Sequence, residues 1–132
     1  MYQQVTIVGN LGADPSMRYT PDGVPVTSFS VATNVKWRDD GGTQHERVTW
    51  WRVTAWRKLA ETCNEYLAKG RQVLVTGTMS AEPDGNPRVW TDNAGNTRAS
   101  YELRADTVRF IGGSSARGDE PAPAAAGEDL PF

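Results

Sequence analysis

The chain has 132 residues, 38% of them hydrophobic and 23% charged, and a formal net charge of −2. This length accommodates one compact domain and a tail, and the absence of any apolar run of about 18 residues excludes a membrane-spanning helix. The single cysteine excludes an internal disulfide and a cysteine-based metal cluster, and the amino terminus lacks the apolar segment of a secretory signal, so we expect a cytoplasmic protein.

The first half of the chain is rich in strand signals. Segments with many β-branched residues and alternating polarity predict strands over residues 3–11, 24–35 and 48–56. Arg18 and Tyr19 form a short extended piece before a Pro-Asp-Gly turn at 21–23. The polar segment 38–47, which contains two aspartates followed by two glycines, is expected to be a mobile hairpin loop.

One amphipathic segment stands out between the third and fourth predicted strands. Apolar residues recur there at helical spacing: Leu59, Cys63, Tyr66 and Leu67. Gly70 follows at the place where a helix C-cap belongs. The pattern predicts a helix over residues 58–69.

The second half returns to strands. Residues 72–80 predict a fourth strand, and the two prolines within 82–87 interrupt it because proline has no N–H for a sheet ladder. Residues 88–91 and 97–105 are strand pieces that flank a turn, and 107–111 closes the body. Five strands with one helix between the third and the fourth is the element order of an OB-fold barrel. We therefore expect an all-β fold with one helix, namely a five-stranded OB-fold barrel with long β-hairpin loops.

The last 21 residues differ in composition from the rest. Residues 112–132 are dominated by Gly, Ser, Ala, Pro and acids, so this segment cannot bury enough apolar surface to offset the entropy of ordering. We expect two parts, an OB-fold domain at 1–111 and a disordered acidic tail at 112–132. The tail holds one arginine and four acids, a charge of −3, which leaves +1 on the body. An acidic appendage on a polyanion-binding body fits this asymmetry, and so does an ordinary surface with a solvated tail.

Five tryptophans in a short chain are the strongest functional indication. Because side chains alternate across a strand, Trp50, Arg52 and Trp56 share one face, and Val53 and Ala55 on the other face suit a core. An unpaired buried arginine is costly, so the face with Arg52 is expected to meet solvent or a polar partner. Two indoles around a guanidinium suit unpaired nucleic acid, since every base offers a π-face. The alternative is that Trp50 and Trp56 fill the barrel.

Trp37 and Trp90 lie at the edges of the two predicted hairpins, each with cations nearby. A large apolar ring at the edge of a polar loop suggests a ligand. The alternative is a ring folded back over its own hairpin.

Several motifs, taken together, resemble the bacterial single-stranded DNA-binding protein family. They are VTIVGNLG at residues 5–12, DP at 14–15, RYTPDG at 18–23, WRD at 37–39, WWRV at 50–53, KLAE at 58–61, YL at 66–67, KG at 69–70 and WTD at 90–92. The match runs in order from residue 2 to about 111. The chain then ends in Asp129, Leu130, Pro131 and Phe132, which is similar to the family's acidic tip closing in Pro-Phe.

The resemblance implies a function and a set of residues. It implies a cytoplasmic, nucleoid-associated homotetramer. This protein would bind and protect single-stranded DNA, independent of sequence, during replication, recombination and repair. By motif position, the base-stacking aromatics are Trp37, Trp50, Trp56 and Trp90. Nearby basic positions are Arg18, Arg38, Arg52 and Lys58. The last four residues, Asp129 to Phe132, match the tip that docks on replication, recombination and repair proteins.

Three departures from the family pattern are visible. Trp51 stands where a well-known enterobacterial form has histidine, near a subunit contact. Residues 81–87 are longer than the matching loop, which affects the expected path of the DNA or the packing of tetramers. Only Glu128 and Asp129 precede Leu130 at the tip, fewer acids than in many relatives, which predicts weaker partner binding.

Two other function classes remain as alternatives. An RNA-binding or primosome-type OB module would keep the fold and change the partner. An enzyme such as a nuclease would need clustered carboxylates with a metal, or a nucleophile with a base, and the acids here are scattered through turns. His45 is the only histidine and is interpreted as a solvated loop residue, and Cys63 as an inert core residue. We therefore expect no enzymatic activity, no metal and no cofactor.

Overall fold

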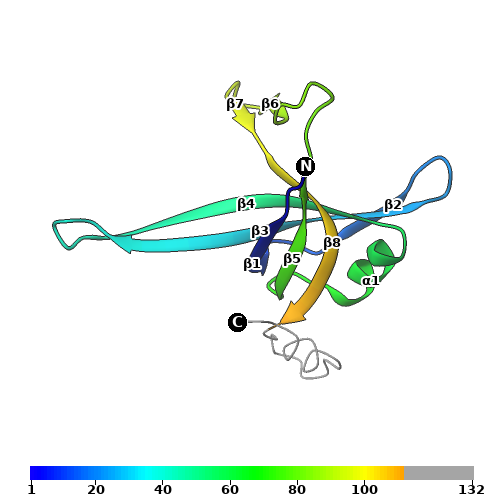
Figure 1. Cartoon of the computed structure of the whole chain (residues 1–132), viewed down its shortest axis with the longest axis horizontal. Helices are drawn as coiled ribbons and strands as arrows, with labels where there is room; N and C mark the ends of the chain where they lie inside the picture. Colours follow the sequence, from blue (N-terminus) through cyan, green and yellow to red (C-terminus); the bar gives the residue numbers. More distant parts are fainter. Residues whose placement is uncertain (112–132) are drawn as a thin grey trace.

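The structure is a computed structural model and describes residues 1–111. The predicted tail at 112–132, with its docking tip, lies outside the described residues. The elements in chain order (Figure 1) are β1 Val5–Leu11, β2 Ser16–Tyr19, β3 Pro25–Arg38, β4 Gln44–Trp56, α1 Lys58–Tyr66, β5 Gln72–Met79, β6 Val89–Thr91, β7 Thr97–Ala99 and β8 Tyr101–Ile111.

Five of these strands close into a barrel. The sheet order is β1-β5-β8-β4-β3-β2, and an additional pairing of β1 with β3 joins the two ends, leaving β2 as an extra strand on β3. The pairing of β4 with β8 is parallel, and the others are antiparallel. The helix follows the third barrel strand and precedes the fourth. The predicted five-stranded OB-fold barrel with one helix is therefore confirmed.

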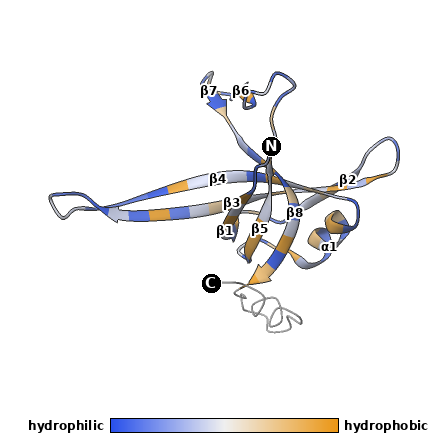
Figure 2. Cartoon of the chain, in the orientation of Figure 1, coloured by the Kyte–Doolittle hydropathy of each residue, from blue (hydrophilic) through white to orange (hydrophobic). Residues whose placement is uncertain are grey.

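The core follows the alternation that the sequence predicts. Val53 and Ala55 are fully buried inside the barrel, with Phe29 and Leu103 opposite Val53 on the neighbouring strands. Figure 2 shows hydrophobic colouring concentrated in the barrel strands and α1, and mostly hydrophilic or intermediate colouring along the hairpin that β3 and β4 extend beyond the barrel. The inward face of β4 is therefore a packing surface, and its outward face is free for another role.

Helix α1 is tied to the barrel by packing and by one buried hydrogen bond. Cys63 of the helix and Leu67, just beyond it, lie in the core, and the hydroxyl of Thr27 donates to the Ala60 carbonyl at 2.7 Å. The helix ends three residues earlier than predicted, because Leu67 is extended and turns into the core. Gly70, with φ of 86°, belongs to the following turn, where its N–H donates to the Leu11 carbonyl.

Two glycines allow the barrel strands to approach each other closely. A Cβ on Gly9 would overlap the carbonyl oxygen of Ala32, and a Cβ on Gly77 would overlap the carbonyl oxygen of Arg104. The β5–β8 ladder also shifts register between Thr76 and Gly77. A glycine in a strand interior often marks such an approach or a bulge. Barrel closure therefore depends on the absence of side chains at these positions.

The hairpin between β3 and β4 corrects one prediction. The sequence predicts a mobile loop over residues 38–47, but β3 continues to Arg38 and β4 begins at Gln44, so only residues 39–43 form the turn. Cross-strand contacts explain the difference: the side-chain amide of Asn34 donates to a Glu46 carboxylate oxygen at 2.9 Å, and Trp37 lies opposite His45. Polar cross-strand pairs stabilise a sheet without a hydrophobic pattern.

Replacing Arg57 by glycine is expected to stabilise the protein. Arg57 is the one non-glycine residue with positive φ among the described residues, at φ 60° and ψ −127°, and its N–H donates to the Pro25 carbonyl at 2.9 Å. Such backbone strain costs about 1–3 kcal/mol. Glycine removes the strain, but it also raises the conformational entropy of the unfolded chain, which cancels part of the gain in stability. We expect Arg57→Gly to raise the free energy of unfolding by about 1 kcal/mol, measured by urea denaturation.

Arg57→Ala is the matched control, because it removes the same guanidinium but keeps the Cβ that causes the strain. If the alanine and glycine variants unfold at the same urea concentration, the backbone at this position is not strained.

Candidate nucleic-acid interface

The outward face of β4 carries three of the predicted interface residues, Trp50, Arg52 and Trp56. Trp50 and Arg52 are exposed, with 54% of Trp50 accessible, and Trp56 is half-buried on the same face. The residues opposite Trp50 and Arg52 on β3 are Ala32 and Ser30, which are small. Trp50 therefore does not fill the barrel, and the small neighbours leave its ring uncovered from that side.

The Trp50 ring lies over the backbone at Gly12. A Cβ built on Gly12 would lie 2.5 Å from Cζ3 of the Trp50 indole, so only glycine leaves room for the ring in this position. Gly12 itself is fixed by its N–H, which donates to the Ser30 carbonyl at 3.1 Å. One edge of the indole therefore rests on a fixed backbone segment, which holds the ring at a defined place on the outer face.

Trp56 lies in a row of residues that crosses several strands. Val26 of β3 is its register partner, and Arg18 of β2 is the partner of Val26, so these side chains point to the same face. From the other side, the Arg104 guanidinium carbon lies 5.6 Å from the centre of the Trp56 ring. We call the set Arg18, Trp50, Arg52, Trp56 and Arg104 the barrel wall. Lys58, exposed at the start of α1, follows two residues after Trp56.

Arg104 is the member of the barrel wall that sequence reasoning missed. It reaches Trp56 only because β8 pairs in parallel with β4, with Thr54 opposite Arg104. A pairing between segments about 50 residues apart leaves no local pattern in the sequence. A cation over an indole face attracts the ring quadrupole and presents positive charge at the same spot.

Trp37 and Arg38 lie on the projecting part of the β3–β4 hairpin, residues 34–48, which we call the long arm (Figure 1). The Trp37 ring stacks on the His45 ring with centroids 5.4 Å apart and 23° between planes, and the Arg47 guanidinium lies 5.3 Å from the Trp37 centroid. The ring packs on its own hairpin, yet 42% of Trp37 stays exposed. The interpretation of His45 as a loop residue is wrong, because it lies in β4 and is the stacking partner of Trp37, while its side chain stays 42% exposed to solvent.

Trp90 lies on the β6–β7 hairpin, residues 89–99, which we call the short arm. Its Nε1 donates to the Ser100 hydroxyl at 2.9 Å, and 39% of the residue is exposed. Arg98 is its register partner across the hairpin. The ring nitrogen of Trp90 is therefore fixed by Ser100, just beyond the short arm, and part of the ring stays exposed.

The structure brings together some predicted residues and separates others. Arg18, Trp50, Arg52 and Trp56 share the barrel wall. His45, the partner of Trp37, lies five residues before Trp50 on β4, a separation of about 17 Å along the strand. Figure 1 shows the two arms leaving the barrel in different directions. The predicted aromatics therefore form one wall and two separate arm sites.

Two acidic side chains on the arms are held by hydrogen bonds. The His45 side chain, followed by backbone N–H groups, lowers the pKa of Asp39, and the Arg98 guanidinium is the main cause of a lowered pKa for Asp92. A carboxyl group whose pKa is lowered in the folded state stabilises the fold when the pH is above its ordinary pKa. This contribution is lost as the pH falls through the lowered pKa. Both carboxylates are therefore ionised near neutral pH.

Other chemistry has little support in the part of the chain that the structure describes. Burial raises the pKa of the Cys63 thiol to about 12, so the thiolate is not available as a nucleophile. Residues 1–111 hold no group of three or more His, Cys, Asp or Glu side chains placed to bind a metal ion. None of the described helices is long and apolar enough to cross a membrane.

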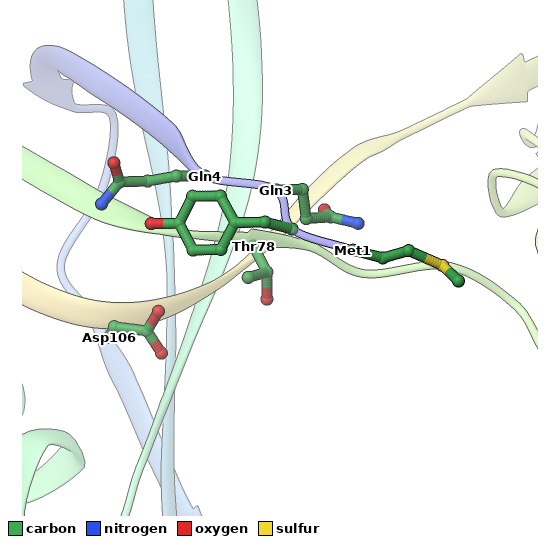
Figure 3. A pocket seen from close by; sticks show the side chains of 6 residues that line it. Met1, Gln3, Gln4, Thr78 and Asp106 are labelled. Atoms are coloured by element: carbon green, nitrogen blue, oxygen red, sulfur yellow. The ribbon is translucent and has the colours of Figure 1, made fainter.

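A pocket of about 480 Å³ lies by the amino-terminal segment (Figure 3). It is lined by Met1, Tyr2, Gln3, Gln4, Thr78 and Asp106. The side-chain carbonyl of Gln3 accepts a hydrogen bond from the Met79 N–H at 2.8 Å, which fixes the segment. The lining has a carboxylate and no lysine or arginine side chain, and it contains none of the predicted binding residues. The pocket is therefore separate from the candidate interface.

Comparison with known proteins agrees with this geometry. The model of the single-strand binding protein family matches residues 2–111. Single-stranded DNA-binding protein 1 of Xylella fastidiosa (strain 9a5c) is 40% identical over 110 residues, covering 83% of this chain and 76% of that protein.

A second relative is the single-stranded DNA-binding protein of Caldanaerobacter subterraneus subsp. tengcongensis. It is 42% identical over 124 residues, and the match covers 93% of this chain and 77% of the length of that protein. Among solved structures, the Plasmodium falciparum SSB complex with ssDNA matches with a TM-score of 0.68 and 24% identity, covering 85% of this chain and 96% of that one. This structural likeness supports the OB-fold assignment.

Proposed function

The chain belongs to the single-strand binding protein family, and from that premise we propose that it binds single-stranded DNA without sequence preference. Bases stack on exposed indoles, while arginines and lysines pair with phosphates and release counterions. The family consists of non-enzymatic DNA-binding proteins, with which the prediction of no enzymatic activity agrees. Roles in DNA replication, recombination and repair are typical of the family.

The observation that carries this proposal is the barrel wall. Two indoles, at Trp50 and Trp56, lie on one outward strand face with the exposed Arg52 between them. In an ordinary soluble domain, such a face would leave the large apolar ring of Trp50 and part of the Trp56 ring in contact with water, with no compensating interaction. An unpaired nucleic acid strand supplies both a π-surface for the rings and a phosphate for the guanidinium.

The experiment is a titration of the full chain with oligothymidine, followed by tryptophan fluorescence at several salt concentrations. We expect quenching, and an affinity that falls as salt rises. Duplex DNA of the same length and an RNA oligomer run in parallel. Equal affinity for duplex, or no quenching, would refute the proposal, and tighter binding of RNA would favour an RNA-binding module.

We propose roles for individual residues on the same basis. The stacking positions are Trp37, Trp50, Trp56 and Trp90. The phosphate-contacting positions are Arg18, Arg38, Arg52 and Lys58, to which the barrel wall adds Arg104. Domain 1–111 would then bind DNA, and 112–132 would act as the tail. We extend this proposal to the assembly and location of the protein. It would form a homotetramer in the cytoplasm, associated with the nucleoid, and Trp51 and residues 81–87 would influence the assembly.

The carboxyl-terminal residues carry a separate proposal. We propose that Asp129, Leu130, Pro131 and Phe132 dock on replication, recombination and repair proteins. The support is chemical: an apolar ring close to acidic side chains suits an apolar pocket with basic residues at its rim. Removing Phe132 is expected to weaken capture of such partners in a pull-down and to leave affinity for oligothymidine unchanged. Undiminished capture would contradict the docking role.

A further inference from the structure

The long arm and the short arm are built on one pattern. A tryptophan is followed two residues later by aspartate, five residues later by a glycine with positive φ, and eight residues later by a basic side chain. In both arms the basic residue is the register partner of the tryptophan. The long arm has Trp37, Asp39, Gly42 and His45, and the short arm has Trp90, Asp92, Gly95 and Arg98.

In the long arm, Asp39 uses both carboxylate oxygens. Oδ1 accepts hydrogen bonds from the backbone N–H groups of Gly41 at 3.0 Å and Thr43 at 2.9 Å. Oδ2 lies 2.8 Å from Nε2 of His45, the residue that stacks on Trp37. One carboxylate therefore connects the turn backbone to the side chain that supports the indole.

In the short arm, Asp92 repeats these contacts. Oδ1 accepts from the backbone N–H groups of Ala94 and Asn96, both at 2.9 Å. Oδ2 accepts from Nε of Arg98 at 2.7 Å. The same arrangement at two sites that are separate in sequence argues for a shared task and against chance.

Two other turns provide an internal comparison. The turns at 20–24 and 82–86 form the same pair of backbone hydrogen bonds, such as Gly23 N–H to the Thr20 carbonyl and Gly85 N–H to the Glu82 carbonyl. Neither turn follows a tryptophan, and neither contains an ion pair within residues 1–111. The backbone turn therefore forms without a side-chain bond between an aspartate and a basic residue, and that bond occurs in the two turns that follow a tryptophan.

Charge gives an independent reason to assign a role to these acids. An unpaired carboxylate two residues from a stacking indole would repel the phosphates of the strand. Asp39 and Asp92 are instead each bonded to a basic side chain across the hairpin. We propose that Asp39 and Asp92 are positioning residues for single-stranded DNA binding, each holding the side chain opposite an arm tryptophan and so fixing the indole for a base. This inference rests on the proposed function.

The test is a pair of charge-matched variants in the full chain, Asp39→Asn and Asp40→Asn. Asp40 is exposed in the same turn, and its side chain accepts no hydrogen bond from the described residues. Each variant removes one negative charge from the same turn. If only charge mattered, the two variants would bind oligothymidine with the same affinity as each other, equal to or slightly tighter than that of the wild type. We expect Asp39→Asn to weaken binding about 3- to 10-fold, part of what a stacking contact contributes, and Asp40→Asn to leave binding unchanged or tighter.

A second readout separates positioning from general damage. In a Trp37→Ala background, Asp39→Asn is expected to cause no further loss, because the aspartate acts through the indole. The short arm repeats the test with Asp92→Asn, and with Asp84→Asn as control, since Asp84 accepts a turn hydrogen bond from Asn86 but has no tryptophan to position. Equal affinities of each variant and its control, with wild-type binding intact, would overturn the inference and leave the proposed function standing. Failure of the wild type to bind oligothymidine would overturn both.

Discussion

Gly77→Ala is expected to destabilise the protein by about 3 kcal/mol, a large part of the roughly 5–15 kcal/mol that holds a domain folded. The added Cβ would overlap the Arg104 carbonyl oxygen, with the Ala105 Cα only 3.0 Å away, and both obstacles are backbone. A backbone neighbour cannot move aside as a side chain does, so the β5–β8 ladder must separate at its irregular point. Guanidinium unfolding followed by circular dichroism measures the effect.

The control for this variant is Gly41→Ala. The nearest atom to a Cβ at Gly41 is the Asp39 Oδ1 at 3.6 Å, an ordinary contact, and Gly41 is not among the glycines with positive φ. Its free energy of unfolding should stay within about 0.5 kcal/mol of the wild type. If the two alanine variants unfold at the same guanidinium concentration, the barrel does not depend on the close approach of the strands at Gly77.

Removing both indoles of the barrel wall is expected to have the largest effect on binding. A base stacked on an aromatic side chain contributes about 1–3 kcal/mol in single-strand-binding proteins generally. Trp50 and Trp56 lie six residues apart on β4, about 20 Å along the strand, so their contributions should add. The double variant Trp50→Ala, Trp56→Ala should lose about 2–6 kcal/mol, which is at least about a 30-fold weaker dissociation constant for oligothymidine.

Two controls separate stacking from folding in this experiment. Replacing both residues by phenylalanine keeps an aromatic face and should restore most of the affinity. Trp51→Phe changes a neighbouring indole that packs against the core and donates to the Thr33 hydroxyl at 3.2 Å, and it should leave DNA affinity within about twofold. Stacking on the wall is refuted if the double alanine variant binds as tightly as Trp51→Phe, or if phenylalanine restores nothing.

The sequence predicts those parts of the molecule that follow a local period. Alternation along β4 places Val53 inside and Trp50 with Arg52 outside, because a strand has a side-chain period of two. The helix is found for the same reason, through its apolar stripe. The barrel and most of its outward wall therefore follow from the spacing of residues along the chain.

Features that depend on contacts between distant segments could not be predicted. Arg104 reaches Trp56 through a parallel pairing, and the long arm is held by polar pairs such as Asn34 with Glu46, which look like a loop when read in isolation. Arg57 could not be predicted either, since arginine gives no indication of a positive φ and only its backbone geometry reveals it. In each case tertiary geometry overrides the local preference of the residue.

Under the proposed function, the separation of the wall from the two arms would make the protein a multivalent receptor within one chain. A short oligonucleotide can engage one of the three sites, and a longer one can bridge them, so that each further contact forms at the high effective concentration set by the tether. Apparent affinity should then rise in steps with nucleotide length, and a strand held at several points can release one contact at a time. Partial release of this kind would let another protein gain access to a segment of the strand without complete dissociation.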